Sequence, residues 1–186
     1  MVLQQEDVVL EFRGEQKRYT PQTNLEGVKL FPLKRWVDDR GLFLELYRRE
    51  ATHAGTQELA QFFSKLEFAQ LNYSLVSVAD HIKGLHYHLR QADVWFCPPP
   101  FKIKVVLLDL RKNSPTTGQT QVVVLGEGRD AWLYIPEGVA HGYRPLTNPC
   151  GLFYLVTRCF DLQNPDEFRI PWDHPKVRDL WDVKNE

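Results

Sequence analysis

An all-β fold, a sandwich or barrel of antiparallel strands, is predicted by three features of the sequence. Short apolar stretches recur along the chain, and several of them alternate apolar with polar residues. Turn residues separate the stretches at intervals of roughly 10 to 14 residues, which is typical of sandwiches and barrels. A single domain is expected, because 186 residues that are 43% hydrophobic can bury one core of ordinary size.

The expected strands follow one another between glycine, proline and asparagine residues. Residues 41–48, "GLFLELYR", alternate Leu42 and Leu44 against Phe43 and Glu45. Residues 101–111, "FKIKVVLLDLR", alternate at first and then become continuously apolar. Further β-rich stretches are "TQVVVLGEG", "DAWLYIPEG" and "GLFYLVTRCF".

One helix and two flanking segments complete the expected organisation. In residues 50–68 Thr56 is a candidate N-cap, followed by apolar residues on one helical face: Leu59, Phe62, Phe63 and Leu66. We expect residues 1–27 to be an N-terminal extension and residues 28–160 to be the barrel. Residues 161–186, rich in proline and charge, are expected to pack over the barrel as an irregular arm with short helical turns.

The charge and cysteine content exclude several classes of protein. With 23 basic and 24 acidic residues the chain has no bulk attraction to nucleic acid or to a membrane surface. No apolar run approaches the length of about 18 residues that spans a bilayer, and the charged N-terminus does not resemble a signal peptide. Three widely spaced cysteines without a C-x-x-C pair favour neither a disulfide framework nor a zinc ribbon. We expect a cytoplasmic protein.

The stretch "IKGLHYHLRQAD" contains the most informative polar residues. Alternation along a strand places His86 and His88 on the same face, and His141 follows a Pro-x-Gly turn in "IPEGVAHGY". A single strand histidine is more often a surface or satisfied core residue than a catalyst. Two functional readings remain open here. His86 is a candidate general base, and His86, His88, Asp93 and His141 are candidate ligands of a divalent metal, in a pattern that resembles metal-binding cupins.

A wider set of motifs, found in a fixed order over residues 28–181, resembles the dTDP-4-dehydrorhamnose 3,5-epimerase family. The matching stretches are "DDRGLFLE", "QLNYS", "KGLHYH", "LDLRKNSPTTGQ", "LYIPEGVAHGY", "FYLVTRCFD" and "IPWDHPKVRDLW". The resemblance implies a double-stranded β-helix, the cupin or jelly-roll barrel, with a few short helices. It also implies an epimerase or isomerase that removes a proton at C3, C5 or both of a nucleoside-diphosphate 4-keto-6-deoxy sugar.

The resemblance further implies a role for individual residues. His86 matches the catalytic base, and Tyr154 matches the tyrosine that returns a proton to the opposite face of the sugar. Arg40 and Lys83 match cations that hold the diphosphate. The other positions that match the substrate pocket are Phe43, Glu45, Gln70, Asn72, His141 and Tyr143. The family works without cofactor or metal, and its members form homodimers by exchanging N-terminal strands. We therefore expect a homodimer that needs no cofactor. The molecule that it is expected to bind is the nucleotide-sugar substrate.

The sequence departs from the family pattern close to the expected chemistry. Asp93 occupies the position of a family lysine that stabilises the enolate oxygen, and a carboxylate there would repel developing negative charge. Candidate replacements for this lysine are Arg90, Lys102 and Lys104. The family's C-terminal S-x-K-D segment, whose aspartate pairs with the base, has no match; candidate replacements are Asp93, Asp173 and Asp182.

Two further substitutions keep other functions open. Phe160 replaces a second family tyrosine, and His88 replaces a glutamine. His88 and Asp93 together create the metal-site pattern from a metal-free template. A metal-dependent cupin and a non-catalytic relative that binds a sugar nucleotide are therefore the alternatives to an epimerase.

Overall fold

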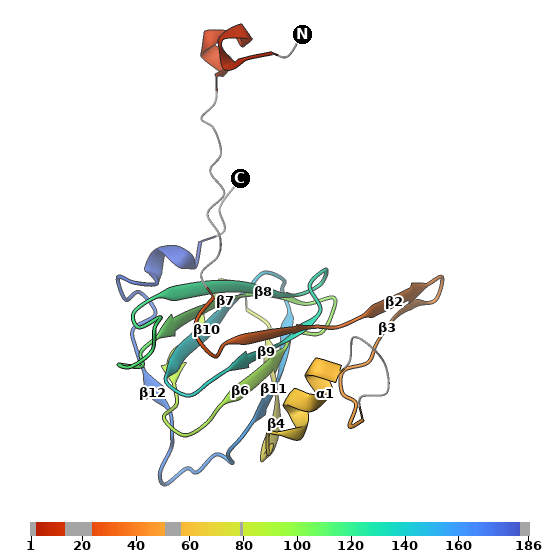
Figure 1. The fold of residues 1–186 in the computed structure, drawn as a ribbon, viewed down its shortest axis with the longest axis vertical. Coiled ribbons are helices and arrows are strands. Elements are labelled where there is room, and N and C mark those ends of the chain that lie inside the picture. Colours follow the sequence, from red (N-terminus) through yellow and green to blue (C-terminus); the bar gives the residue numbers. More distant parts are fainter. Residues whose placement is uncertain (1–2, 14–23, 51–56, 79, 183–186) are drawn as a thin grey trace.

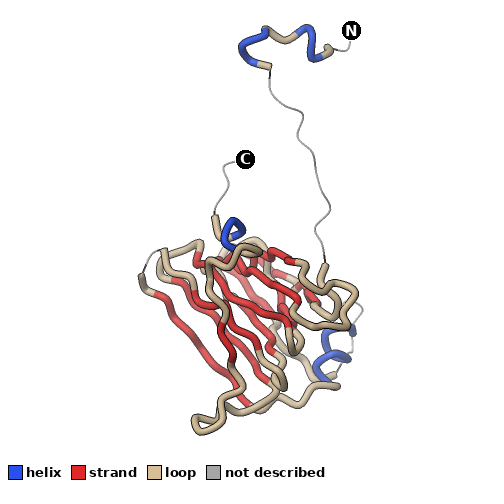
Figure 2. Tube along the Cα trace, turned by 90° about the vertical axis from the view of Figure 1, so that its left-hand side faces the viewer, coloured by secondary structure: helices blue, strands red, loops and turns tan. Residues whose placement is uncertain are grey.

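The structure, a computed structural model, describes residues 3–13, 24–50, 57–78 and 80–182, and consists mainly of two five-stranded antiparallel sheets. The first sheet contains, in spatial order, β1 (Lys29–Pro32), β9 (Ala131–Ile135), β6 (Asp93–Phe96), β11 (Cys150–Val156) and β4 (Gln70–Val76). The second contains β12 (Phe168–Arg169), β5 (Lys83–Tyr87), β10 (Val139–Pro145), β7 (Lys102–Asp109) and β8 (Thr120–Gly126). The arrangement, visible in Figure 1 and Figure 2, confirms the predicted all-β cupin-like fold.

The main core lies between the two sheets. Trp95 and Leu133 of the first sheet pack in one buried cluster with Val105 and Leu125 of the second. These residues alternate along their strands with residues on the outer faces, as a two-sheet fold requires. The alternation seen in residues 101–105 of the sequence therefore identified the inward-facing Ile103 and Val105 of β7.

The continuously apolar part of β7 has a separate cause, because its outer face is covered as well. Val106 and Leu108 pack in a second cluster with Val177 and Trp181 of the C-terminal segment. The Trp181 indole N–H donates to the carbonyl oxygen of Trp172 at 2.7 Å. Residues 168–181 thus supply strand β12, the short 3-10 helix η3 (Arg178–Leu180) and a cover for the second sheet.

The helix expected in residues 50–68 is present as α1 (Gln57–Ser64) and covers the outer face of the first sheet. Phe63 packs with Phe31, Val94 and Trp132 in a third cluster, to which the other three predicted apolar residues of this segment also belong. Thr56, the expected N-cap, lies outside the described residues. Two further 3-10 helices, η1 (Gln5–Asp7) and η2 (Leu10–Phe12), lie near the N-terminus.

A two-stranded hairpin, β2 (Arg35–Asp38) and β3 (Gly41–Leu44), projects from the barrel (Figure 1). Its exposed side chains include Trp36, Val37 and Phe43, whose exposed fractions are 55%, 70% and 62%. A monomer rarely leaves so many large apolar groups together in water, so this surface resembles an interaction surface.

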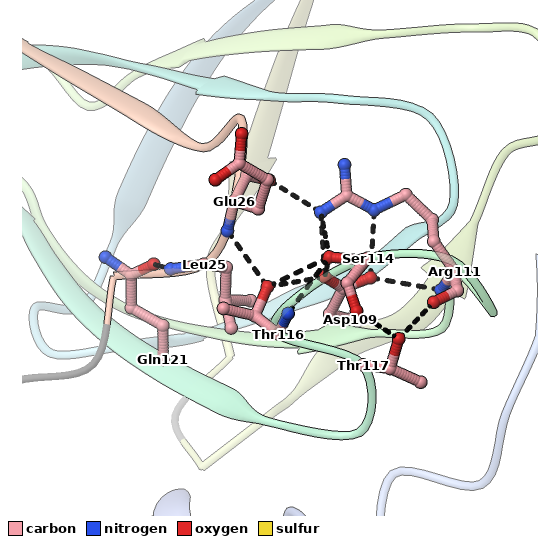
Figure 3. A network of polar contacts seen from close by, with 8 residues as sticks. All are labelled: Leu25, Glu26, Asp109, Arg111, Ser114, Thr116, Thr117 and Gln121. Atoms are coloured by element: carbon pink, nitrogen blue, oxygen red, sulfur yellow. Dashed lines mark hydrogen bonds and ion pairs between the residues drawn. The ribbon is translucent and has the colours of Figure 1, made fainter.

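The "LDLRKNSPTTGQ" motif has a structural role at the connection between β7 and β8 (Figure 3). The buried Asp109 carboxylate accepts hydrogen bonds from Arg111 Nε at 2.9 Å and from the hydroxyl groups of Ser114 and Thr116. Arg111 Nη2 and Thr116 also bind the backbone of Glu26. The motif therefore fastens the segment before β1 to the second sheet.

Within the described part of the chain, every helix is too short or too polar to cross a lipid bilayer.

Candidate active site

A cavity of about 900 Å³ opens between the two sheets and contains six of the residues predicted from the sequence. They are His86, Tyr154, Gln70, Asn72, Lys83 and Tyr143. His141 lies behind this lining and is only 2% exposed. The cavity has the size of an ordinary small-molecule site.

The two predicted catalytic residues reach the cavity from opposite sheets. On β5, His86 lies between His141 of β10 and Arg169 of β12 in the strand register. On β11, Tyr154 lies between Asn72 of β4 and Trp95 of β6. Each sheet therefore presents one potential proton-transfer group at the centre of a row of polar or aromatic side chains.

Two motif glycines allow β5 and β10 to lie close enough to bring these histidines together. A Cβ atom on Gly84 would lie 2.5 Å from the Cα atom of Gly142, and the φ angle of Gly84 is +130°. No L-residue with a side chain is accommodated at that distance and conformation. The His86 and His141 rings lie 4.4 Å apart between centroids as a result of the close strand approach.

His86 is an uncharged imidazole in this environment. Burial and the neighbouring His141 and His88 rings lower the pKa of His86 to about 2. Among the described residues no carboxylate makes a hydrogen bond to His86. Asp173 and Asp182, two of the candidate replacements for the family aspartate, do not line the cavity. Asp173 is exposed, and the backbone carbonyl oxygen of Asp182 accepts a hydrogen bond from Lys104. Asp93 is the carboxylate whose charge acts on His86.

Asp93 is a buried carboxylate at the bottom of the cavity. Its oxygens accept hydrogen bonds from Gln91 Nε2 at 2.8 Å and from Trp95 Nε1 at 3.0 Å. Burial alone would favour the neutral acid, but His141 and His88 in their protonated forms, together with the Trp95 N–H, outweigh it and lower the pKa of Asp93 to about 2. The negative charge expected at this position is therefore present.

Four potential metal ligands surround this point. One donor atom from each of His86, His88, Asp93 and His141 lies within 4.8 Å of all the others. The structure thus brings together the four residues that the sequence identified as possible ligands, three of them buried.

Tyr154 is suited to donate a proton rather than to carry a charge. Burial, together with the charges of Asp93 and Glu167, raises the pKa of the Tyr154 phenol. Burial likewise raises the pKa of Tyr143 to about 12, and its hydroxyl lies 3.4 Å from Ser74 Oγ. Both phenols are protonated at neutral pH.

Besides His141, three residues predicted to bind substrate lie outside the cavity lining. Arg40 and Phe43 are on the projecting hairpin, where the Arg40 side chain is 85% exposed and pairs with Asp38. Glu45 follows the hairpin and pairs with Arg48 at 2.6 Å. Their place in substrate binding stays a prediction that depends on a second copy of the chain.

The cavity also contains cations that the sequence analysis did not assign to it or left undecided. Arg158 and Arg169 line it, as does Arg90, whereas Lys102 and Lys104 do not. Arg158 continues the alternation of Tyr154 and Val156 beyond the end of β11, so extending the two-residue period would have identified it. Arg169 could not be found in this way, because β12 is only two residues long and lies in the arm.

Comparison with known families gives a match over most of the chain. The family described as dTDP-4-dehydrorhamnose 3,5-epimerase matches residues 22–185. A curated relative, the spore coat polysaccharide biosynthesis protein SpsL of Bacillus subtilis, is 38% identical over 161 residues, covering 86% of this chain and 98% of the relative.

Two solved structures share the fold at moderate identity. The dTDP-4-dehydrorhamnose 3,5-epimerase of Bacillus anthracis, with TDP and PPi bound, superposes with a TM-score of 0.73 at 27% identity, covering 88% of this chain and 90% of that one. An epimerase of Legionella pneumophila in complex with dTDP-4-keto-L-rhamnose has a TM-score of 0.71 at 26% identity, covering 89% of this chain and 84% of that one.

Proposed function

Because this chain belongs to the dTDP-4-dehydrorhamnose 3,5-epimerase family, we propose that His86 and Tyr154 carry out its reaction from opposite sides of the cavity. The chain is an epimerase that acts on a nucleoside-diphosphate 4-keto-6-deoxy sugar. Membership of this family favours that activity over a metal-dependent cupin of another reaction class and over a non-catalytic binding protein. The cytoplasmic location expected from the sequence stays a prediction.

The observation that supports the proposed roles is that one cavity is lined by His86 from the second sheet and by Tyr154 from the first. An imidazole nitrogen of His86 takes the proton from a carbon next to the C4 ketone. The electron pair of that C–H bond moves toward the C4 oxygen and forms an enolate. The Tyr154 hydroxyl then gives its proton to the opposite face of the same carbon, which inverts the stereocentre. Proton exchange with water restores both residues.

The cationic residues of the cavity supply a site for the diphosphate. Lys83 Nζ donates a hydrogen bond to Ser74 Oγ at 2.7 Å, and Lys83 lines the cavity together with Arg158 and Arg169. Ammonium and guanidinium groups bind phosphate oxygens through charge-assisted hydrogen bonds. Substrate binding would therefore place the diphosphate against these groups and the ketone toward His86.

Gln70 and Asn72 are proposed to recognise polar groups of the nucleotide or sugar. Gln70 Nε2 donates to Asn72 Oδ1 at 2.6 Å, and Gln70 Oε1 accepts from the backbone N–H of Phe160 at 3.0 Å. These bonds fix the orientation of both amides at the wall of the cavity. The remaining Asn72 N–H groups are available to a ligand.

A homodimer is proposed to complete the site. The hairpin carries exposed apolar groups and the exposed Arg40, and none of these lines the cavity of its own chain. Packing the hairpin against a second copy would cover the apolar groups. It would also carry Arg40 and Phe43 to the partner's cavity. There the additional guanidinium group of Arg40 and the aromatic ring of Phe43 would suit a nucleoside diphosphate.

Product analysis tests the proposed activity. The purified protein is incubated with a dTDP-4-keto-6-deoxyhexose, and the configuration at C3 and C5 is read by NMR after chemical reduction of the ketone. Inversion at C3, C5 or both is expected. Unchanged substrate, together with tight binding of the nucleotide sugar, would support a binding protein instead.

A further inference from the structure

Three buried polar side chains meet at the bottom of the cavity, where His88 and Asp93 line it and His141 lies behind the lining. The side chains of His88, Asp93 and His141 are 8%, 3% and 2% exposed. His88 Nε2 lies 3.8 Å from Asp93 Oδ1, and His141 Nε2 lies 3.6 Å from Asp93 Oδ2. Both distances are longer than a hydrogen bond.

The outer nitrogen of each of these two imidazoles is occupied by a backbone carbonyl. His141 Nδ1 lies 2.9 Å from the carbonyl oxygen of Val139, and His88 Nδ1 is hydrogen-bonded to the carbonyl oxygen of Asp166. A carbonyl oxygen only accepts, so each Nδ1 carries the hydrogen and donates it. In the neutral form of each imidazole, Nε2 therefore directs a lone pair toward the Asp93 carboxylate.

This arrangement leaves a buried nitrogen atom without a partner among the residues that the structure describes. That atom is His141 Nε2. Buried polar atoms are almost always paired, and the backbone bonds that fix both imidazoles are the usual outer contacts of metal-binding histidines. Two imidazole lone pairs and a carboxylate converging on one point need a positive species between them.

We propose that His88, Asp93 and His141 bind one divalent first-row metal ion, such as zinc, manganese or iron(II). Two histidines and one carboxylate are a donor set that such ions prefer, and it leaves coordination positions open. Bonds of about 2.0–2.2 Å place neighbouring ligand atoms about 3.0–3.6 Å apart. The 3.6 Å separation between His141 and Asp93 lies at the edge of this range, and the 3.8 Å separation between His88 and Asp93 is slightly longer. The donor atoms of His88 and His141 lie within 4.8 Å of each other.

His86 is left outside this set of ligands. It is more exposed than the other three, and among the described residues no backbone carbonyl fixes either of its nitrogens. Its donor atom nevertheless lies within 4.8 Å of theirs. A base and a metal-bound substrate oxygen would therefore lie side by side.

The metal would take part in the proposed epimerase reaction by stabilising the enolate, and this catalytic role rests on the proposed function. Asp93 occupies the position of the lysine expected to stabilise the enolate in this family, so the carboxylate alone would oppose the reaction. A cation on Asp93 reverses the sign of the local charge. As His86 removes the proton and the electron pair moves to the C4 oxygen, that oxygen gains negative charge, which a cation with an open position stabilises.

The test is metal binding by the full-length protein. Protein purified without chelator is analysed by mass spectrometry for metal content, and chelator-treated protein is titrated calorimetrically with Zn²⁺ and followed spectroscopically with Co²⁺. We expect one equivalent per chain, micromolar or tighter affinity, and visible absorption bands from bound Co²⁺. Wild-type protein that binds neither ion at one equivalent would overturn the inference without any variant.

Matched variants assign the ligands. Asp93→Asn and His88→Gln should each weaken Zn²⁺ binding by at least about 100-fold, because a direct ligand contributes more than an outer contact, whose loss costs about 10- to 100-fold. The exposed His81, which lies outside the cavity lining, gives the control His81→Gln, with unchanged binding. His86→Asn should keep the metal, and loss of binding in that variant would contradict the three-residue site.

Activity separates this inference from the proposed function. Epimerisation by protein shown to be free of metal would overturn the metal's catalytic role and leave the epimerase intact. One bound equivalent of metal without any epimerisation or proton exchange would support the site and overturn the proposed function.

Discussion

His86 of β5 and Tyr154 of β11 line one cavity from facing sheets, each at the centre of a row of three residues across its sheet. Inversion of a carbon needs a proton acceptor on one side and a donor on the other, and two facing sheets provide these two positions.

Replacement of Tyr154 by phenylalanine should separate proton removal from inversion. Turnover should fall by about 10²- to 10⁴-fold, the usual contribution of a positioned acid. His86 would still form the enolate, so recovered substrate should acquire deuterium from heavy water while keeping its configuration. The control is Tyr134→Phe, outside the cavity on β9. An unchanged rate of inversion in Tyr154→Phe would exclude the phenol as the donor.

Replacement of Lys83 by methionine should weaken binding of the nucleoside diphosphate. A charge-assisted hydrogen bond contributes about 1.5–3 kcal/mol, so the affinity for dTDP should fall about tenfold or more, with a smaller difference at high salt. Calorimetric titration with dTDP measures this. Lys102→Met is the control, because Lys102 does not line the cavity. Equal losses in both variants would indicate a general charge effect and not a specific contact.

Arg40 provides a test of the homodimer. If Arg40 acts in the partner's cavity, dimers that combine Arg40→Ala with His86→Asn contain one intact cavity and one that carries both substitutions. Random mixing of the two inactive proteins should restore about a quarter of wild-type activity, since half of the dimers are mixed and each has one working site of two. Mixing that restores nothing would place Arg40 in its own chain's cavity or outside any cavity.

Asp109 should stabilise the fold in a pH-dependent manner without affecting catalysis. Burial opposes its ionisation, but the bonds from Arg111, Ser114 and Thr116 dominate and hold the pKa of Asp109 below its ordinary value. The stabilisation is therefore complete above about pH 4, the pKa range of an unfolded aspartate, and is lost as the pH falls toward the lowered pKa.

The Asp109→Asn variant measures this contribution. At pH 7 its free energy of unfolding in urea should be lower by about 3 kcal/mol, because the Arg111 charge loses its buried partner. The difference from wild type should shrink below about pH 4. Turnover per folded molecule should be unchanged, because Asp109 is not among the residues that line the cavity. A difference in stability that does not change with pH would contradict this account.

The sequence predicted the fold and the centre of the cavity because both depend on local patterns. The two-residue alternation along β5 placed His86 and His88 on one face, and the glycines of the two histidine motifs mark the close approach of β5 and β10. Ordered motifs then indicated that His86 and Tyr154 belong to one cavity.

The rest depends on contacts between distant segments. The arm residue Arg169 reaches the cavity through β12, a pairing of two residues that no periodicity reveals. The backbone carbonyls that fix His88 and His141 cannot be read from side-chain identity. The positions of Arg40 and Phe43 away from the cavity follow from a hairpin that projects from the barrel, so a single chain does not determine their role.

The central claim is that His86 removes a proton from the sugar, and deuterium incorporation tests it most directly. Protein is incubated with a dTDP-4-keto-6-deoxyhexose in heavy water, and deuterium at C3 and C5 is measured by NMR and mass spectrometry for wild type, His86→Asn and the control His81→Asn. The account predicts incorporation at C3, C5 or both by wild type and His81→Asn, and a loss of at least about 100-fold in His86→Asn. Incorporation by His86→Asn at the wild-type rate would contradict it.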